Sequence, residues 1–141
     1  MQITTKTEYS VRALIEVGLR NGTPVSIREI CASQQLPDKY VEQLFSRLKK
    51  HNLITSIPGA HGGYKLAKDP QDINLQDIMD AAEDNTYQPY CSAKPETDFC
   101  IGNPCVLQKL WQDLHQHMKG YLEELSLQQI MDRIKEGSHE S

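Results

Sequence analysis

Three helical patterns of apolar positions follow one another at the start of the chain. The first covers residues 7–20, where apolar side chains recur at near-helical spacing. The second covers residues 27–34. Ser26 directly before it and Glu29 three residues later have the spacing of a capping box. The third follows a proline-containing break and runs up to residues 51–52, with apolar side chains every three or four positions. This order predicts a helix followed by a helix-turn-helix pair.

A β-hairpin is predicted directly after these helices. Residues 53–57 form a β-branched run, residues 58–63 are rich in glycine and typical of a turn, and residues 64–66 alternate as a strand. A fourth helix is expected over residues 74–82. Helix, helix-turn-helix and hairpin in this order indicate a winged helix, and we assign residues 1–83 to a winged helix-turn-helix DNA-binding domain.

A long helix with a seam of large apolar residues is predicted near the C-terminus. Asn103 and Pro104 are typical of a helix start. The seam residues then follow at intervals of 4, 3, 4, 3 and 4, a heptad pattern: Leu107, Trp111, Leu114, Met118, Tyr121 and Leu125. A helix of about 20 residues is about 30 Å long, too long for so small a domain to cover. We therefore expect it to pack on its twin in a homodimer.

The remaining segments complete the predicted organisation. Residues 84–103 show neither helical nor strand periodicity, which is typical of a ligand-binding loop. Residues 104–136 are assigned to the dimerisation helix and a short terminal helix, and residues 137–141 to a flexible tail. The expected fold class is mainly α with a small β-hairpin wing, a winged helix-turn-helix plus a long dimerisation helix.

Composition adds a charge asymmetry to this picture. The chain of 141 residues is 38% hydrophobic and 24% charged, with a net charge of -4, as expected for a small globular protein. Residues 1–70 nevertheless carry a net charge of +4 and residues 71–141 a net charge of -8. A locally basic surface is what phosphate contacts require, so the acidic average does not exclude double-stranded DNA as a partner.

The outer face of the third helix is the predicted DNA-contacting surface. We expect the third helix to lie in a major groove, while glycines let the hairpin tip approach the backbone or the minor groove closely. The predicted contacts are Tyr40, Glu42, Gln43 and Arg47 to bases, Lys39, Lys49 and Lys50 to phosphates, His61, Gly62 and Gly63 at the tip, and Arg28. A winged helix can also be a protein-interaction module, and this alternative stays open.

Several other function classes are not supported by the sequence. No window approaches the roughly 18 consecutive apolar residues of a membrane helix, and the N-terminus lacks an apolar signal region, so we expect a cytoplasmic protein without membrane contact. A glycine-rich phosphate loop, a G-x-S-x-G motif and a helical histidine pair are all absent from the sequence. We therefore expect no enzymatic activity.

Three of the four cysteines lie within fifteen residues of one another. Cys91, Cys100 and Cys105 have the spacing C-x8-C-x4-C, and thiolates are the soft ligands that iron-sulfur clusters or zinc take. Cys105 lies in the first turn of the long helix, where the helix dipole favours a thiolate. Cys31 falls at an apolar-facing position of the second helix and is expected in the core. The alternatives are a bound zinc ion, or redox thiols that form a regulatory disulfide without any cluster.

A resemblance to a known family becomes specific at this point. The residues 40–50, followed by Leu53–Ile54, Gly62–Gly63–Tyr64 and later Leu110–Trp111 ahead of Ser126–Leu127, resemble the bacterial winged-helix regulators of the IscR and NsrR type. The likeness covers nearly the whole chain. It implies a homodimeric transcription factor that crosses its long helices, binds a palindromic operator and senses iron supply, oxidant or nitric oxide through an iron-sulfur cluster. Pro58 stands where IscR-like proteins often carry an arginine, which leaves His61 as a weaker substitute.

The resemblance also suggests a fourth cluster ligand. IscR-like proteins have a histidine three residues after the last cysteine, where this chain has Gln108, a poor iron ligand. NsrR-type proteins use a carboxylate from the N-terminal segment of the other subunit, a position that Glu8 matches. We therefore expect the three cysteines and Glu8 of the partner subunit to hold a 2Fe-2S or a 4Fe-4S cluster. Glu8 is preferred to His115 and His117, which stand two residues apart and face different ways.

Overall fold

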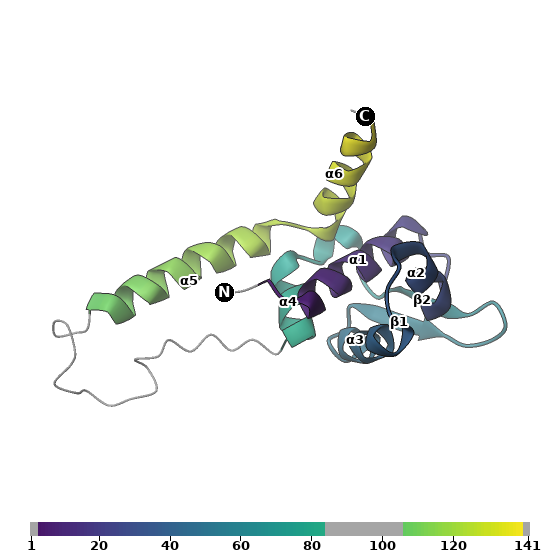
Figure 1. The fold of residues 1–141 in the computed structure, drawn as a ribbon. Coiled ribbons are helices and arrows are strands. Elements are labelled where there is room, and N and C mark those ends of the chain that lie inside the picture. The colour runs from purple at the N-terminus through teal and green to yellow at the C-terminus, as the bar shows by residue number, and fades with distance from the viewer. Residues whose placement is uncertain (1–2, 84–105, 140–141) are drawn as a thin grey trace.

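The computed structural model describes residues 3–83 and 106–139. A winged helix-turn-helix unit forms the body of the molecule, and one long helix projects from it (Figure 1). The elements in chain order are α1 (Thr5–Leu19), α2 (Ile27–Gln34), α3 (Asp38–Lys50), β1 (Ile54–Ile57), β2 (Gly63–Leu66), the 3-10 turn η1 (Pro70–Asp72), α4 (Leu75–Glu83), α5 (Val106–Glu124) and α6 (Leu127–His139). The predicted order of elements is confirmed.

Local hydrogen bonds explain where the helices begin. The Ser26 hydroxyl accepts from the Glu29 amide at 3.1 Å, and the Glu29 carboxylate accepts from the Ser26 amide at 3.2 Å, so the predicted capping box is present at α2. A reciprocal pair of the same kind joins Asn74 to Asp77 before α4. At α1 the Thr4 hydroxyl accepts from the Thr7 amide at 3.4 Å, which moves the start of α1 two residues ahead of the predicted residue 7.

The two strands form an antiparallel hairpin that is hydrogen-bonded to the helix-turn-helix. Ile54 pairs with Leu66 and Ile57 with Gly63, and Val25 forms a bridge to Tyr64 just before α2. The close approach leaves no room for a side chain at Gly63, because a Cβ there would lie 2.6 Å from the Val25 carbonyl oxygen. The wing is therefore fixed to the body near the turn end of its two strands.

The core lies where α1, α2, α3, α4 and the hairpin meet. Its largest fully buried side chains include Leu14, Ile30, Phe45 and Leu48. Helix α6 belongs to the same core, because Leu127 and Met131 are buried and Met131 packs against Gly18 of α1. Residues 104–136 were predicted to form the dimerisation helix and a terminal helix, whereas α6 packs on the winged domain. Helix α6 also continues to His139, beyond residue 137, where a tail was expected.

Helix α5 is the exception to this packing. Among its residues only Leu122 is buried, and large apolar side chains along it remain exposed. At 1.5 Å per residue its 19 residues span about 28 Å. Within the described part of the chain, no helix is long and apolar enough to cross a membrane.

Candidate functional site

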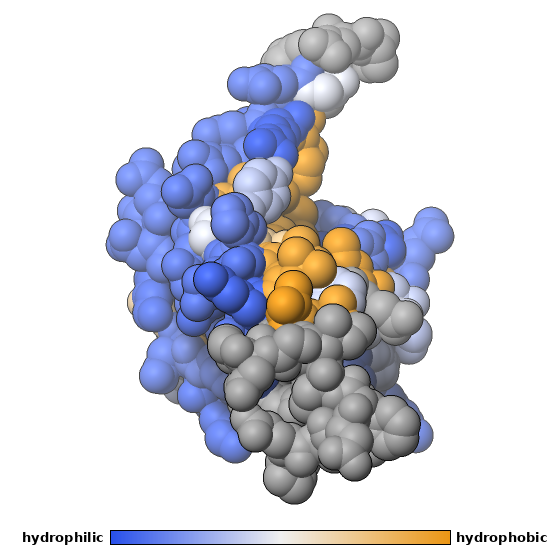
Figure 2. All heavy atoms as spheres, turned by 90° about the vertical axis from the view of Figure 1, so that its left-hand side faces the viewer, coloured by the Kyte–Doolittle hydropathy of each residue, from blue (hydrophilic) through white to orange (hydrophobic). Residues whose placement is uncertain are grey.

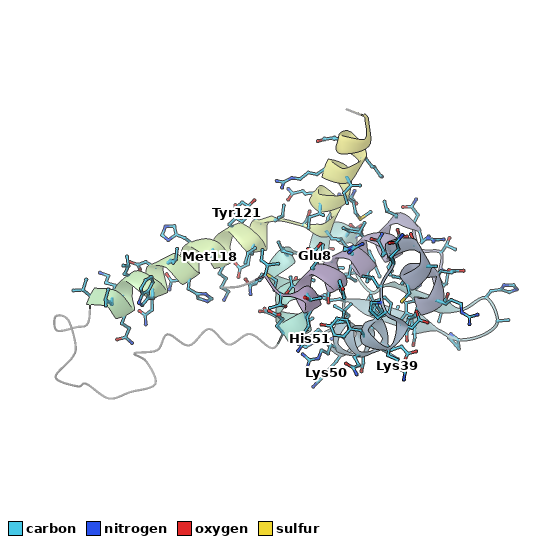
Figure 3. All side chains as sticks on the ribbon, in the orientation of Figure 1. Glu8, Lys39, Lys50, His51, Met118 and Tyr121 are labelled. Carbon is cyan, nitrogen blue, oxygen red and sulfur yellow. The ribbon has the colours of Figure 1, made fainter. Side chains whose placement is uncertain are left out.

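The outer face of α3 carries exposed polar and basic side chains. Lys39, Glu42, Gln43, Lys49 and Lys50 are all exposed. Lys39 and Lys50, at the two ends of α3, lie on the same side of the molecule (Figure 3). Arg28 on α2 and His61 at the hairpin tip are exposed as well. An exposed basic helix beside a β-hairpin can contact a nucleic-acid groove and its phosphates.

Two of the predicted base contacts have partners inside the chain. The ring of Tyr40 packs edge-on against Tyr9 of α1, with a centroid distance of 5.4 Å and an interplanar angle of 84°. The Arg47 guanidinium donates from Nη1 to the Ala82 carbonyl of α4 at 3.0 Å. Both side chains are half-buried. The structure therefore directs Tyr40 and Arg47 towards neighbouring helices, in contrast to the exposed residues of the same helix.

Contacts between α3 and the hairpin join the two elements that are predicted to face DNA. Phe45 packs edge-on against Tyr64 of β2, with the ring centroids 5.0 Å apart. The Lys49 ammonium donates to the Ser56 hydroxyl of β1 at 3.0 Å. At the tip, a Cβ on Gly62 would collide with the Ile57 carbonyl oxygen, so this glycine is required by the hairpin itself. Helix α3 and the wing are thus held together as one unit.

An apolar groove lies where α5 leaves the body. Its cavity volume is about 610 Å³, and its walls come from α1, α4, α5 and α6 and include Val11, Met79, Met118, Leu122 and Ile130. The side of the molecule on which α5 projects carries an orange apolar patch with polar residues to either side of it (Figure 2). The seam residues Met118, Tyr121 and Leu125 line this groove.

Glu8 lies in the wall of this groove. Its carboxylate is exposed and forms no hydrogen bond or ion pair with any described residue. Figure 3 shows Glu8 on the side of α1 that faces α5, on which Met118 and Tyr121 lie. His117 lines the same groove, and its Nδ1 lies 2.7 Å from the Asp113 carbonyl oxygen. A carboxylate with no partner beside an apolar surface is a candidate ligand for a metal centre.

The N-terminal half of the predicted seam is exposed to solvent in the single chain. Leu107, Trp111 and Leu114 are 36%, 43% and 51% exposed. Leu110 and Val106 beside them are 52% and 60% exposed. Five large apolar side chains exposed on one short stretch mark an interaction surface. The sequence pattern predicted the seam, but it did not single out Val106.

The cysteines divide into two groups. Cys91, Cys100 and Cys105 lie outside the described residues, and within the described ranges no group of three His, Cys, Asp or Glu side chains is close enough to hold a metal ion. Cys31 is buried, as predicted. Burial, a hydrogen bond with Asp38 and the negative charges of Asp38 and Glu42 raise the pKa of the Cys31 thiol to about 11. A thiol that stays protonated is a poor metal ligand.

A polar network between α1 and α2 was not found from the sequence. Arg12 donates from Nη2 to the Gln34 carbonyl at 2.8 Å and from Nε to the Gln34 side-chain oxygen at 3.2 Å. The Gln34 amide in turn donates to Glu16 at 2.7 Å. The i,i+4 spacing of Arg12 and Glu16 is a weak signal for a charged helix face, and nothing in it identifies Gln34 as the partner.

Comparison with known proteins relates this arrangement to one family. Residues 3–133 match the sequence model of the Rrf2 family, described as an iron-dependent transcriptional regulator. The chain is 33% identical over 133 residues to the HTH-type transcriptional regulator IscR of Klebsiella pneumoniae strain 342, covering 94% of this chain and 80% of that protein. For IscR of Escherichia coli O1:K1 the identity is 32%, with 94% and 81% covered.

Solved structures give the same relationship. T. potens IscR superposes with a TM-score of 0.77 at 27% identity, covering 97% of this chain and 90% of that chain. CymR of B. subtilis, described as a global cysteine regulator, superposes with a TM-score of 0.76 at 28% identity, covering 94% and 98%. These relatives are named as regulators and not as enzymes, in agreement with the prediction from the sequence, and their superposition confirms the winged helix.

Proposed function

Because the chain belongs to the Rrf2 family of transcriptional regulators, we propose that it is a homodimeric regulator whose affinity for an operator depends on an iron-sulfur cluster. The observation that carries the proposal is the placement of Glu8. Its carboxylate has no partner among the described residues, and it lies beside the long helix whose first turn follows Cys105 in the sequence. Helix α1 then connects the cluster to the DNA-binding helix, because it carries Glu8 and also packs against α3.

The dimer follows from the two halves of α5. An antiparallel pair of α5 helices about a twofold axis near Leu114 places Leu107 of one protomer against Tyr121 of the partner subunit. The N-terminal half of each seam, exposed in the single chain, then fills the apolar groove of the other protomer. Burying a half-exposed Leu or Trp side chain contributes about 1 kcal/mol or more, so several such residues favour a stable dimer.

The same pairing brings cluster ligands from two protomers together. Leu107 follows Cys105 by two residues, and Tyr121 lines the groove that also contains Glu8. Cys91, Cys100 and Cys105 of one protomer would therefore hold the cluster with Glu8 of the partner subunit. The donors fit such a group, because thiolates bind iron tightly and a carboxylate oxygen is a more exchangeable ligand. When bound, the cluster supplies the redox or ligand-exchange chemistry that reports the signal.

The cluster is tested by the visible absorption spectrum of anaerobically purified protein together with iron, sulfide and zinc analysis. Replacing Cys91, Cys100 or Cys105 by Ala is expected to remove the visible absorption, whereas Cys31→Ala is the matched control that keeps it. Glu8→Gln is expected to make the cluster more labile, with Glu124→Gln, another exposed acid, as its control. Mixing Glu8→Gln with Cys105→Ala protein should restore one intact site per heterodimer.

Two results would point to a different regulator. The likeness to CymR, described as a global cysteine regulator, favours a clusterless thiol-based regulator as the second candidate. Protein that carries no iron but whose DNA affinity changes with thiol oxidation would support that candidate. Stoichiometric zinc without iron would support a zinc-bound regulator and refute the cluster.

The dimer is tested by sedimentation of variants on α5. Leu114→Glu and Met118→Glu each place a charge in the proposed interface and are expected to give monomers that bind DNA weakly. Gln112→Glu adds the same charge at an exposed position outside the seam and should remain dimeric. Dimers that persist with Glu at both seam positions would refute the α5 interface.

DNA binding is tested by selecting duplexes from a random pool and measuring affinity against salt concentration. A twofold-symmetric dimer is expected to select an imperfect palindrome, with affinity that falls steeply as salt rises. Gln43→Ala should change the base preference, whereas Lys50→Ala should weaken all sequences alike and reduce the salt slope by about one. If neither the cluster-loaded nor the cluster-free protein binds DNA, the winged helix is a protein-interaction module.

A further inference from the structure

The orientation of α3 depends on its contacts with the rest of the body. Phe45 on Tyr64, at 5.0 Å between ring centroids, and Lys49 on Ser56, at 3.0 Å, hold α3 and the wing together. Any displacement of α3 relative to a DNA major groove therefore moves the wing with it. The contacts of α3 with α1 and α4 then decide how this unit is presented to DNA.

Near its N-terminal end, α3 contacts α1 through an aromatic pair. Tyr40 and Tyr9 form an edge-on contact at 5.4 Å, a geometry that is favourable beyond the area it buries. Tyr9 directly follows Glu8, whose side chain lines the apolar groove. A force that displaces the first turns of α1 is thus transmitted to the end of α3 nearest the turn.

In its last turns α3 contacts the end of α4. The Arg47 guanidinium donates to the carbonyl of Ala82, next to the last helical residue, Glu83. The final carbonyls of a helix lack partners within the helix, and a cation near them is favourable because of the helix dipole. The chain continues from this end of α4 towards Cys91, eight residues after Glu83.

We propose that Tyr40 and Arg47 are positioning residues that set the orientation of α3 through α1 and the end of α4, and that neither contacts a base. Both are half-buried and engaged within the chain, whereas Lys39, Glu42 and Gln43 on the same helix are exposed. The inference rests on the proposed function, since the two elements that hold α3 are those that border the proposed cluster ligands. Binding of the cluster then changes DNA affinity through these two contacts.

The test compares DNA affinity with and without the cluster in full-length variants. Arg47→Met removes the donor and Tyr40→Leu removes the ring, while Tyr40→Phe keeps the ring contact and is expected to restore the parent's behaviour. We compare the DNA affinity of the cluster-loaded protein with that of the cluster-free protein. In Arg47→Met and Tyr40→Leu the difference between these two affinities is expected to be about 2- to 30-fold smaller than in the parent protein. The base preference selected from random duplexes and the salt slope should stay those of the parent.

Two control variants define what a DNA contact would look like. Lys50→Ala should reduce the salt slope by about one, and Gln43→Ala should relax preference at one base position. An Arg47→Met variant that behaves like either control contacts DNA, and the inference is wrong. It is also wrong if the thermal stability and both affinities fall while their ratio is unchanged, because the residue then acts only on folding.

Failure of the proposed function has a separate signature. A parent protein without a cluster, or with equal affinity in both states, refutes the cluster-dependent function and with it the coupling. The salt slope and base preference of Arg47→Met and Tyr40→Leu still decide in that case whether the two side chains contact DNA.

Discussion

Replacing Gly63 by alanine is expected to detach the wing from the helix-turn-helix. Gly63 has φ +149°, and a Cβ there would lie 2.6 Å from the carbonyl oxygen and 2.7 Å from the carbonyl carbon of Val25. Carbon atoms make favourable contacts only at about 3.5 Å and beyond, so the two backbones must separate by about 0.8 Å. Backbone atoms cannot rotate away as a flexible side chain can.

The magnitude follows from the bonds that this separation breaks. The Tyr64 amide donates to the Val25 carbonyl at 2.8 Å, and the Val25 amide donates to the Tyr64 carbonyl at 3.0 Å. Lengthened by about 0.8 Å, both fall outside hydrogen-bonding distance. Two lost hydrogen bonds at about 1 kcal/mol each, plus about 1 to 3 kcal/mol of backbone strain, predict a loss of about 3 to 5 kcal/mol.

Thermal unfolding followed by circular dichroism at fixed protein concentration measures this loss. For a chain of this size, about 3 to 5 kcal/mol corresponds to a fall in Tm of roughly 10 to 20 °C. Gly59→Ala is the matched control, because Gly59 has φ +107° but open space where the Cβ would lie. The Gly59→Ala variant therefore has the backbone strain of a positive φ but no collision of the new Cβ with a neighbouring backbone. If Gly63→Ala is no less stable than Gly59→Ala, the collision with Val25 does not limit stability.

Three further predictions concern the body of the molecule. The pKa of the Cys31 thiol is raised from 9.0 to about 11 in the folded protein, so the thiol of the unfolded chain ionises at lower pH. The free energy of unfolding is therefore expected to fall by up to about 3 kcal/mol between about pH 9 and pH 11. Denaturant titrations at several pH values measure this fall, and the Cys31→Ala variant should not show it. Ser26→Ala removes the capping box and should cost about 1 kcal/mol, seen as a lower Tm, and an unchanged Tm would argue against it. Phe45→Ala empties a site that is 1% exposed and should cost about 3 to 5 kcal/mol in urea titration, with a loss well below 2 kcal/mol contradicting its place in the core.

Much of the fold could be predicted from the sequence because its causes are local. The period of apolar residues defined the helices, and the capping box at Ser26 needs only residues three positions apart. Burial of Cys31 followed from its position on the apolar face of α2. The helix boundaries were less accurate, since the two extra residues at the start of α1 depend on the Thr4 hydroxyl and the last turn of α6 includes Gly137.

The candidate site could be predicted only in part. Periodicity identified the outer face of α3, and Lys39, Gln43 and Lys50 are exposed there as expected. The predicted DNA contacts also included Tyr40 and Arg47, because helical spacing alone does not reveal which side chains find partners elsewhere.

Tertiary structure decided the contacts that join distant parts of the chain. The Arg47 side chain meets a carbonyl 35 residues away, and the groove beside Glu8 needs walls from four helices. No local pattern encodes such meetings, since they arise only when the elements pack around a shared core. The sequence by itself determined which residues form each helix and which face is apolar, because propensity, capping and amphipathic period act over a few residues. The packing of these helices determined which polar side chains turn inward, because a half-buried polar group forms hydrogen bonds with the groups that packing brings close to it.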